Sequence, residues 1–216
     1  MKKMILASLL AILALPFIGK SQGTASIDDM TMASLNDQME QLGKQMDDLG
    51  DVMDKYGKEM DVYGKEMDKY GKEVDDNQGA SASLQQKMNE LGEKMNALGE
   101  KMGQQGDEMG KLGDLMGKYG EKIGQKHQDM VNWFFQEMKK DGLISSLNGN
   151  VRIIFDEKGL NVDGEKASDE LYSKYKSGLE KHWGKVLKPD FLFFFKGKVK
   201  EEAGKIELDG NMNSDF

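Results

Sequence analysis

The stretch "MDKYGKEMDVYGKEMDKYGKEV", residues 53–74, consists of three near-identical heptads in a row. Methionine recurs every seventh residue, and a tyrosine follows each of the three methionines that begin these heptads, three residues later. Because an α-helix has 3.6 residues per turn, this spacing gathers these side chains on one side of a helix and predicts a narrow apolar seam. A glycine follows every tyrosine, although each interior glycine costs a helix about 1 kcal/mol relative to alanine.

The same heptad continues from residue 32 to residue 130. When methionine is assigned to position a, it takes most of the a positions, and leucine or tyrosine takes most of the d positions. A sustained apolar a/d repeat is typical of a coiled coil. The predicted interaction seam comprises Met39, Leu42, Met46, Leu49, Met53, Tyr56, Met60, Tyr63, Met67, Tyr70, Met88, Leu91, Met95, Leu98, Met102, Met109, Leu112, Met116 and Tyr119.

Glycine recurs at position e, directly beside this seam. A row of residues without Cβ atoms lets another helix approach closely, so we interpret it as a close-packing stripe. The alternative is that the glycines only loosen the helix; in both cases an isolated arm is predicted to be a poor helix. The stripe comprises Gly43, Gly50, Gly57, Gly64, Gly71, Gly92, Gly99, Gly106, Gly113 and Gly120, and the second half of the repeat adds Gly103, Gly110, Gly117 and Gly124 at position b.

The seam is interrupted at "DDNQGASAS", residues 75–83, which has the composition of a turn. Two helical arms are therefore predicted, at residues 32–74 and 84–137. Turn composition favours an antiparallel hairpin, whereas the unbroken heptad phase favours one uninterrupted rod that dimerises in parallel. The first arm is the more acidic, which disfavours pairing two copies of it and mildly favours the hairpin.

The C-terminal region predicts a small α+β domain over residues 138–205. "VRIIFDEKGLNVDG", residues 151–164, indicates a β-hairpin that turns at "EKG", and a helix is expected to begin after Ser168 or Asp169. The apolar run in "DFLFFFKGKVK", residues 190–200, predicts a buried strand, with a partner contact as the alternative. Residues 206–216 are predicted to be a disordered tail. The predicted fold class is thus mostly α: a long coiled-coil hairpin, or rod, with a small α+β C-terminal domain.

The N-terminus has the pattern of a targeting segment. Two lysines precede the apolar run "MILASLLAILALPFI" (residues 4–18), and small residues follow it. This predicts a signal peptide at residues 1–23 and a linker at residues 24–31; cleavage after Ala25 and a retained membrane anchor are the alternatives. The chain contains no cysteine, which excludes disulfides, thiol chemistry and lipoprotein attachment. We predict an exported protein, periplasmic or secreted, with no stable membrane span after cleavage.

Composition excludes several functional classes. The net charge of −8 argues against nucleic acid as a partner, because phosphate binding needs a basic face. His127 and His182 are the chain's two histidines, and neither belongs to a pattern that indicates a nucleophilic or metal site. We therefore predict a protein that is not an enzyme and has no cofactor. Methionine-rich exported proteins can bind Cu(I) through thioethers, so buffering of metal or oxidant by the seam is the alternative function.

The motif D-G-L-I at 141–144, followed by G-L-x-V-x-G-x-K at 159–166, carries a resemblance. Together with the upstream Met/Gly-rich heptads, it is similar to the C-terminal extracytoplasmic region of some BlaR-type membrane metallopeptidases and their stand-alone relatives. The His-Glu-x-x-His signature of that family is absent here, so its peptidase activity does not carry over. The resemblance implies an extracytoplasmic accessory or sensing module.

These observations together predict a structural or interaction protein of the cell envelope. It is expected to act through its glycine-striped coiled coil, either by binding a protein partner or by associating with itself through helices.

Overall fold

The computed structural model describes residues 26–76, 79 and 81–215. The chain divides into two units, Met1–Met30 and Thr31–Phe216. Within the described end of the first unit, the Asp29 N–H donates to the Ser26 carbonyl at 2.8 Å. The predicted signal peptide and the start of the predicted linker lie outside the described residues.

Two long helices, α1 (Met32–Asp76) and α2 (Ala82–Lys140), account for most of the second unit. The Ser81 hydroxyl caps α2 by accepting the Leu84 N–H at 3.2 Å, which satisfies one of the amides that a helix start leaves without a partner. At its other end, Lys139 and Lys140 fill the last turn, where the helix dipole favours positive charge. Each predicted arm is therefore a helix, and both helices extend slightly beyond the predicted bounds.

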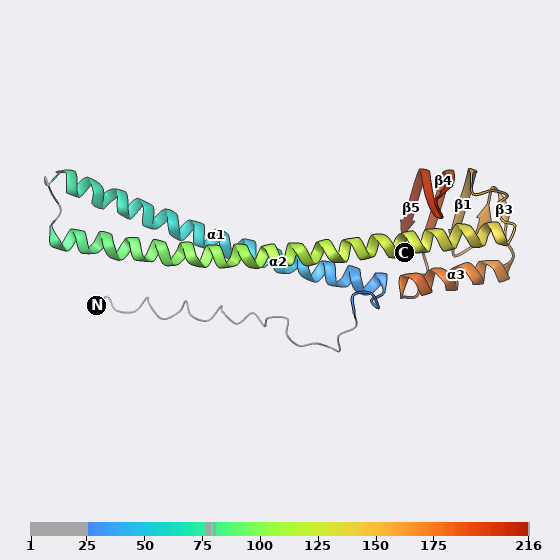
Figure 1. Cartoon of the computed structure of the whole chain (residues 1–216), viewed down its shortest axis with the longest axis horizontal. Coiled ribbons are helices and arrows are strands. Elements are labelled where there is room, and N and C mark those ends of the chain that lie inside the picture. The colour runs from blue at the N-terminus through green and yellow to red at the C-terminus, as the bar shows by residue number, and fades with distance from the viewer. Residues whose placement is uncertain (1–25, 77–78, 80, 216) are drawn as a thin grey trace. The chain divides into compact units, whose positions relative to one another are not determined.

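The helices α1 and α2 pack against each other in antiparallel directions (Figure 1). The Nζ of Lys87 lies 5.8 Å from the ring centroid of Tyr70, and that of Lys94 lies 6.0 Å from the ring centroid of Tyr63. From Tyr70 to Tyr63 the chain steps back seven residues along α1, and from Lys87 to Lys94 it steps forward seven residues along α2. The two helices therefore run in opposite directions. The single chain thus has two separate antiparallel helices, as the hairpin prediction expected, and not one uninterrupted helix, since α1 ends at Asp76 and α2 begins at Ala82.

The C-terminal domain is a five-stranded antiparallel sheet with two helices on one face. The strand order is β3-β2-β1-β4-β5, and the predicted hairpin of residues 151–164 forms its β1–β2 pair. Ser168, one of the two predicted caps, accepts the Leu171 N–H at 3.3 Å at the start of α3. The elements are β1 (Gly149–Asp156), β2 (Gly159–Val162), β3 (Glu165–Lys166), α3 (Asp169–Trp183), β4 (Leu192–Glu202) and β5 (Lys205–Asp215).

The core of this domain lies between the sheet and the helices α2 and α3. Phe134 and Phe135 of α2 pack edge-on against Phe193 and Phe195 of β4, with ring centroids 5.3 Å and 5.9 Å apart. Tyr172 of α3 packs in the same way on Phe155 of β1. The end of α2 therefore belongs to the core of the sheet domain, while its start belongs to the hairpin. The apolar run at 190–200 forms β4, the buried strand that was predicted.

The predicted disordered tail at 206–216 is wrong for residues 206–215. These residues belong to β5, which pairs with β4 along its whole length. The pairing buries Ile206 and lets Leu208 follow on the same face. Two residues with positive φ, Ala203 (49°) and Gly204 (77°), form the tight turn between the strands. This turn is compatible with a two-residue β-hairpin loop. The polar composition of the tail is the reason that the sequence did not predict the hairpin.

A cluster of charged groups joins the end of α2 to α3. Lys174 Nζ donates to Asp141 Oδ2 at 2.7 Å and lies 2.6 Å from Glu137 Oε2, and the Tyr175 hydroxyl donates to Asp141 Oδ2 at 2.9 Å. The hydrogen bonds from Lys174 are the main cause that holds the pKa of both carboxyls below the ordinary value. Burial, and next the hydrogen bond to Asp141, raise the pKa of Tyr175.

Replacing Lys174 by methionine is expected to flatten the acid side of the stability profile. Carboxyls whose folded-state pKa is lowered stabilise the protein fully above their ordinary pKa of about 4, and this contribution is lost as the pH falls through the lowered values. The free energy of unfolding, measured by denaturant titration from about pH 7 to about pH 2, should therefore change less with pH in Lys174→Met than in the unchanged chain. Lys139→Met, at an exposed position of the same helix end, is the control and should keep the original profile. An identical profile for Lys174→Met would refute this role for the cluster.

Candidate interaction surface

The predicted seam lies between α1 and α2. All of its residues are at least partly buried: Leu42, Leu49, Leu91 and Leu98 are fully buried, and the methionines, the tyrosines and Leu112 are half-buried. The structure thus gathers the predicted seam residues on the facing sides of the two helices. Much of the seam stays within reach of solvent, because two helices alone cover only part of it.

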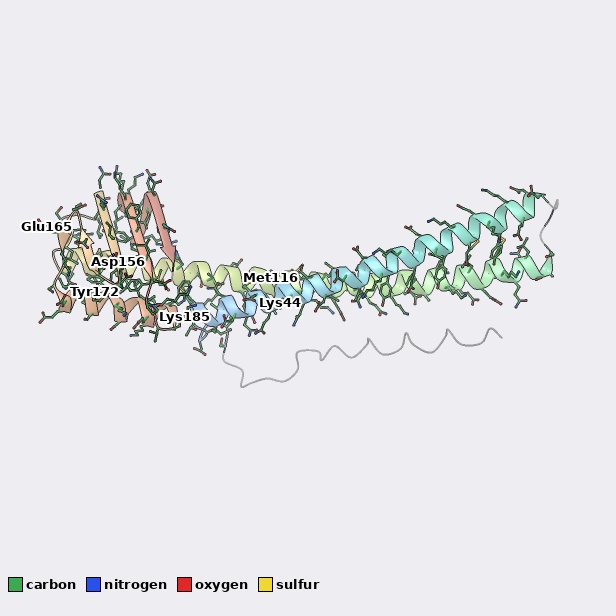
Figure 2. The ribbon with its side chains drawn as sticks, turned by 180° about the vertical axis from the view of Figure 1, so that it is seen from behind. Lys44, Met116, Asp156, Glu165, Tyr172 and Lys185 are labelled. Atoms are coloured by element: carbon green, nitrogen blue, oxygen red, sulfur yellow. The ribbon has the colours of Figure 1, made fainter. Side chains whose placement is uncertain are left out.

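The register places unlike residues opposite each other. Because Lys87 and Lys94 lie over Tyr70 and Tyr63, Met88 and Met95 are level with these tyrosines. Continued along the hairpin, the same register sets Leu91 level with Met67. Figure 2 labels Lys44 of α1 and Met116 of α2 near the same point along the hairpin, which agrees with it. In this register the seam methionines face leucine, tyrosine or, at Met53, Gln105 across the seam rather than another methionine.

The glycine stripe faces open space. A Cβ atom built on any of the ten stripe glycines would have no neighbouring atom within 4 Å, and the same is true of the four glycines at position b. From Gly99 onward, the glycines of α2 are exposed, whereas Gly92 and the five stripe glycines of α1 are half-buried. Close approach of α1 and α2 therefore does not explain the stripe. The prediction that it packs closely against a helix remains a prediction, and it now concerns a helix outside this hairpin.

Glycine has a different role in the C-terminal domain. A Cβ on Gly178 of α3 would lie 1.9 Å from Cη2 of Trp133, so the absence of a side chain there lets the indole of α2 pack directly on α3. A contact of this kind is what the stripe glycines lack within the chain.

The surface of the hairpin carries short-range ion pairs. Lys44 Nζ lies 2.7 Å from Glu40 Oε1 one helical turn away, and this hydrogen bond lowers the pKa of Glu40. Both side chains are exposed, so such a pair contributes little to stability. The charged face is compatible with a solvated surface on the side away from the seam.

The two histidines lie in different surroundings. The ring of His182 lies 5.0 Å from that of Trp133, and burial lowers its pKa. His127 is exposed on α2. Within residues 26–215, apart from 77, 78 and 80, no three His, Asp or Glu side chains gather where they could hold a metal ion.

A second surface, which the sequence did not predict, lies beside β5. A groove of about 400 Å³ lies between α2 and β5, and its lining residues include His127, Gln128, Val131, Leu208 and Met212. The apolar residues Ile206, Leu208 and Met212 alternate with polar ones, which is the period of a strand. This alternation was the available signal, and the one glycine and four Asn or Asp residues from 209 to 215 obscured it.

Comparison with known proteins identifies no relative. No family model matches the chain, and no curated protein or solved structure is similar to it. The resemblance to the C-terminal region of BlaR-type proteins therefore remains a hypothesis based on the two short motifs. Among the described residues, no helix is both long and apolar enough to cross a membrane.

Proposed function

We propose that this protein is an exported, non-enzymatic interaction module of the cell envelope. Its α1–α2 hairpin forms a coiled coil that receives a further helix along the glycine stripe, from a second copy or from another envelope protein. The accessory or sensing role implied by the resemblance is compatible with this proposal. The predicted signal peptide supports the extracytoplasmic location.

One observation carries the proposal: the stripe costs helix stability, and no described residue lies where its missing Cβ atoms would be. Ten interior glycines cost roughly 10 kcal/mol of helix propensity, which is comparable to the whole stability of a domain. The Cβ positions of these glycines are unobstructed, so alanine would fit at each of them. A helix that lies against the stripe would use the missing Cβ atoms, as in other closely packed helix pairs. It would also cover the half-buried methionines beside it, which adapt readily to a new neighbour.

The proposal is tested by following association and helicity together. Sedimentation of the mature chain over a range of concentrations, alone and with an envelope extract, should show a complex, and circular dichroism should show helicity rising as the complex forms. The variant with Gly43, Gly50, Gly57, Gly64 and Gly71 changed to alanine should be more helical but should associate less. The proposal would be contradicted if this variant associated as strongly as the unchanged chain. It would also be contradicted if the unchanged chain stayed monomeric and its helicity did not change with concentration or with added extract.

Export itself makes a separate prediction. The chain recovered from the extracytoplasmic fraction should have lost its first 23 residues and should begin at Thr24, because small residues flank that bond. N-terminal sequencing and intact mass measure this directly. An intact Met1 in the membrane fraction would instead support a retained anchor.

The alternative function, binding of Cu(I) by the methionine seam, gains no specific support. Successive methionines of one helix are about 10 Å apart along the axis, and the register sets no seam methionine opposite another. Copper titration of the unchanged chain against a Met→Leu seam variant tests this alternative, and equal uptake by both chains would exclude it.

A further inference from the structure

The strand β5 forms one edge of the sheet. It pairs with β4 on one side, and in the described part of the chain no strand pairs with its other side. Residues 209–213 are all exposed. Natural proteins usually shorten, twist, charge or cover such an edge, because its free backbone groups are a template for another strand.

Hydrogen bonds identify which backbone groups face outward. The Ile206 N–H donates to Asn132 Oδ1 at 2.8 Å, and the Ile206 carbonyl accepts from Gln128 Nε2 at 2.9 Å. Both groups of Ile206 thus point away from β4, towards α2. Because a strand alternates with a period of two, the N–H and C=O groups of Leu208, Gly210 and Met212 face outward in the same way.

The edge is protected at its start and open beyond it. Gln128 and Asn132 occupy the outward groups of Ile206, whereas no recorded hydrogen bond among the described residues engages the outward groups of Leu208, Gly210 or Met212. Met212 is 45% exposed, and the described residues hold only two other large apolar side chains as exposed as this, Val62 and Val186. The groove beside β5 adds a recess at the same edge, lined by both apolar and polar side chains.

We propose that a second copy of this chain adds its own β5 to this edge, antiparallel, with the two-fold axis at Gly210. Antiparallel addition about a two-fold axis is the self-complementary arrangement in which each strand completes the other. It would join two five-stranded sheets into one continuous sheet. The proposal does not rest on the function proposed for the hairpin.

Avoidance of like charges favours this register over one centred on Leu208. With Gly210 opposite Gly210 of the second copy, Asp209 lies opposite Asn211 of the second copy, and Glu207 lies opposite Asn213. No two like charges then face each other across the new strand pair. A two-fold axis at Leu208 would instead set Glu207 opposite Asp209 of the second copy twice, and directly opposite like charges destabilise a strand pair.

The apolar side of the pair is complementary too. Leu208 would face Met212 of the second copy across the groove, and Met212 would face Leu208, so each copy would cover the exposed methionine of the other. Val131 lines the floor of the same groove. The asparagine and glutamine that engage Ile206 would stop the pairing there, which limits the new ladder to residues 208–212.

A pair of variants at Asn211 tests the register. Asn211 faces Lys196 within the chain and Asp209 across the proposed interface, so a charge placed there has opposite effects on folding and on association. Asn211→Asp should raise the thermal midpoint of the monomer but increase the dimer dissociation constant about two- to thirtyfold. Asn211→Lys should lower the midpoint and decrease the dissociation constant by a similar factor. Sedimentation equilibrium of the mature chain measures the constants.

Cross-linking tests the geometry in this cysteine-free chain. Residue 209 of one copy and residue 211 of the other would lie in a non-hydrogen-bonded pair, with Cα atoms about 4.5 Å apart, close enough for a disulfide. A mixture of the Asp209→Cys and Asn211→Cys chains should form a disulfide-linked dimer, and each variant alone should form much less. Dissociation constants that do not differ between Asn211→Asp and Asn211→Lys, or equal cross-linking by either variant alone, would overturn the proposal.

Discussion

Replacing Gly43, Gly50, Gly57, Gly64 and Gly71 by alanine is expected to stabilise the hairpin strongly. Each substitution should contribute about 1 kcal/mol of helix propensity, so the free energy of unfolding should rise by about 5 kcal/mol in total. The reason is local: an added Cβ would meet no atom within 4 Å at any of these positions. Denaturant titration followed by circular dichroism measures the change.

Gly178→Ala is the matched control for this prediction. It is the same substitution in a helix, but its Cβ would lie 1.9 Å from the Trp133 ring, so the indole or α3 has to move and the protein should lose stability. If the five α1 substitutions also destabilised the monomer, the stripe would be in contact within the chain, and the account of an unused surface would be wrong.

Phe195→Ala is expected to destabilise the sheet domain strongly. Phe195 is fully buried and packs on Phe135 of α2, and truncation of such a ring typically costs 3–5 kcal/mol. The neighbouring Phe194 points to the opposite face of β4, faces Ile154 of β1 and is half-buried. Phe194→Ala should therefore cost about 1 kcal/mol or less.

This matched pair also tests the location of the helices. Chemical denaturation followed by the near-ultraviolet signal of the aromatic cluster gives both values. If the two alanine variants lost equal stability, the helices α2 and α3 would not cover one face of the sheet only. A larger loss for Phe194→Ala would place them on the other face.

The hairpin was predictable because its signal is periodic and redundant. The repeat of methionine, tyrosine and leucine every three and four residues determines which side of each helix is apolar, and no distant residue is needed to establish it. The turn at 75–83 was a weaker inference, because the heptad phase runs through it unchanged. Only the pairing of Lys87 with Tyr70 and of Lys94 with Tyr63 decides in favour of the antiparallel arrangement.

The C-terminal domain shows why the remainder could not be predicted. The strand β5 contains Asp209, Gly210, Asn211 and Asn213, which individually favour turns. It is a strand because β4 provides a ladder for it and because Ile206 has a buried place under α2. Likewise, no local pattern distinguishes Gly178, beside whose Cβ position the Trp133 ring lies, from the stripe glycines, whose Cβ positions have no described atom within 4 Å. These contacts join segments far apart in the sequence.

The central claim is that the stripe is a contact surface, and photo-crosslinking tests it most directly. Because the chain has no cysteine of its own, a benzophenone probe can be attached to a single cysteine at Gly64, on the stripe, or at Val62, which is 52% exposed and lies on the opposite side of α1. The mature chain is irradiated in purified form and in the envelope of cells that produce it. We predict a discrete cross-linked species from position 64, either a dimer or an adduct with one partner, and none from position 62. Equal cross-linking from both positions, or none from position 64, would contradict the account.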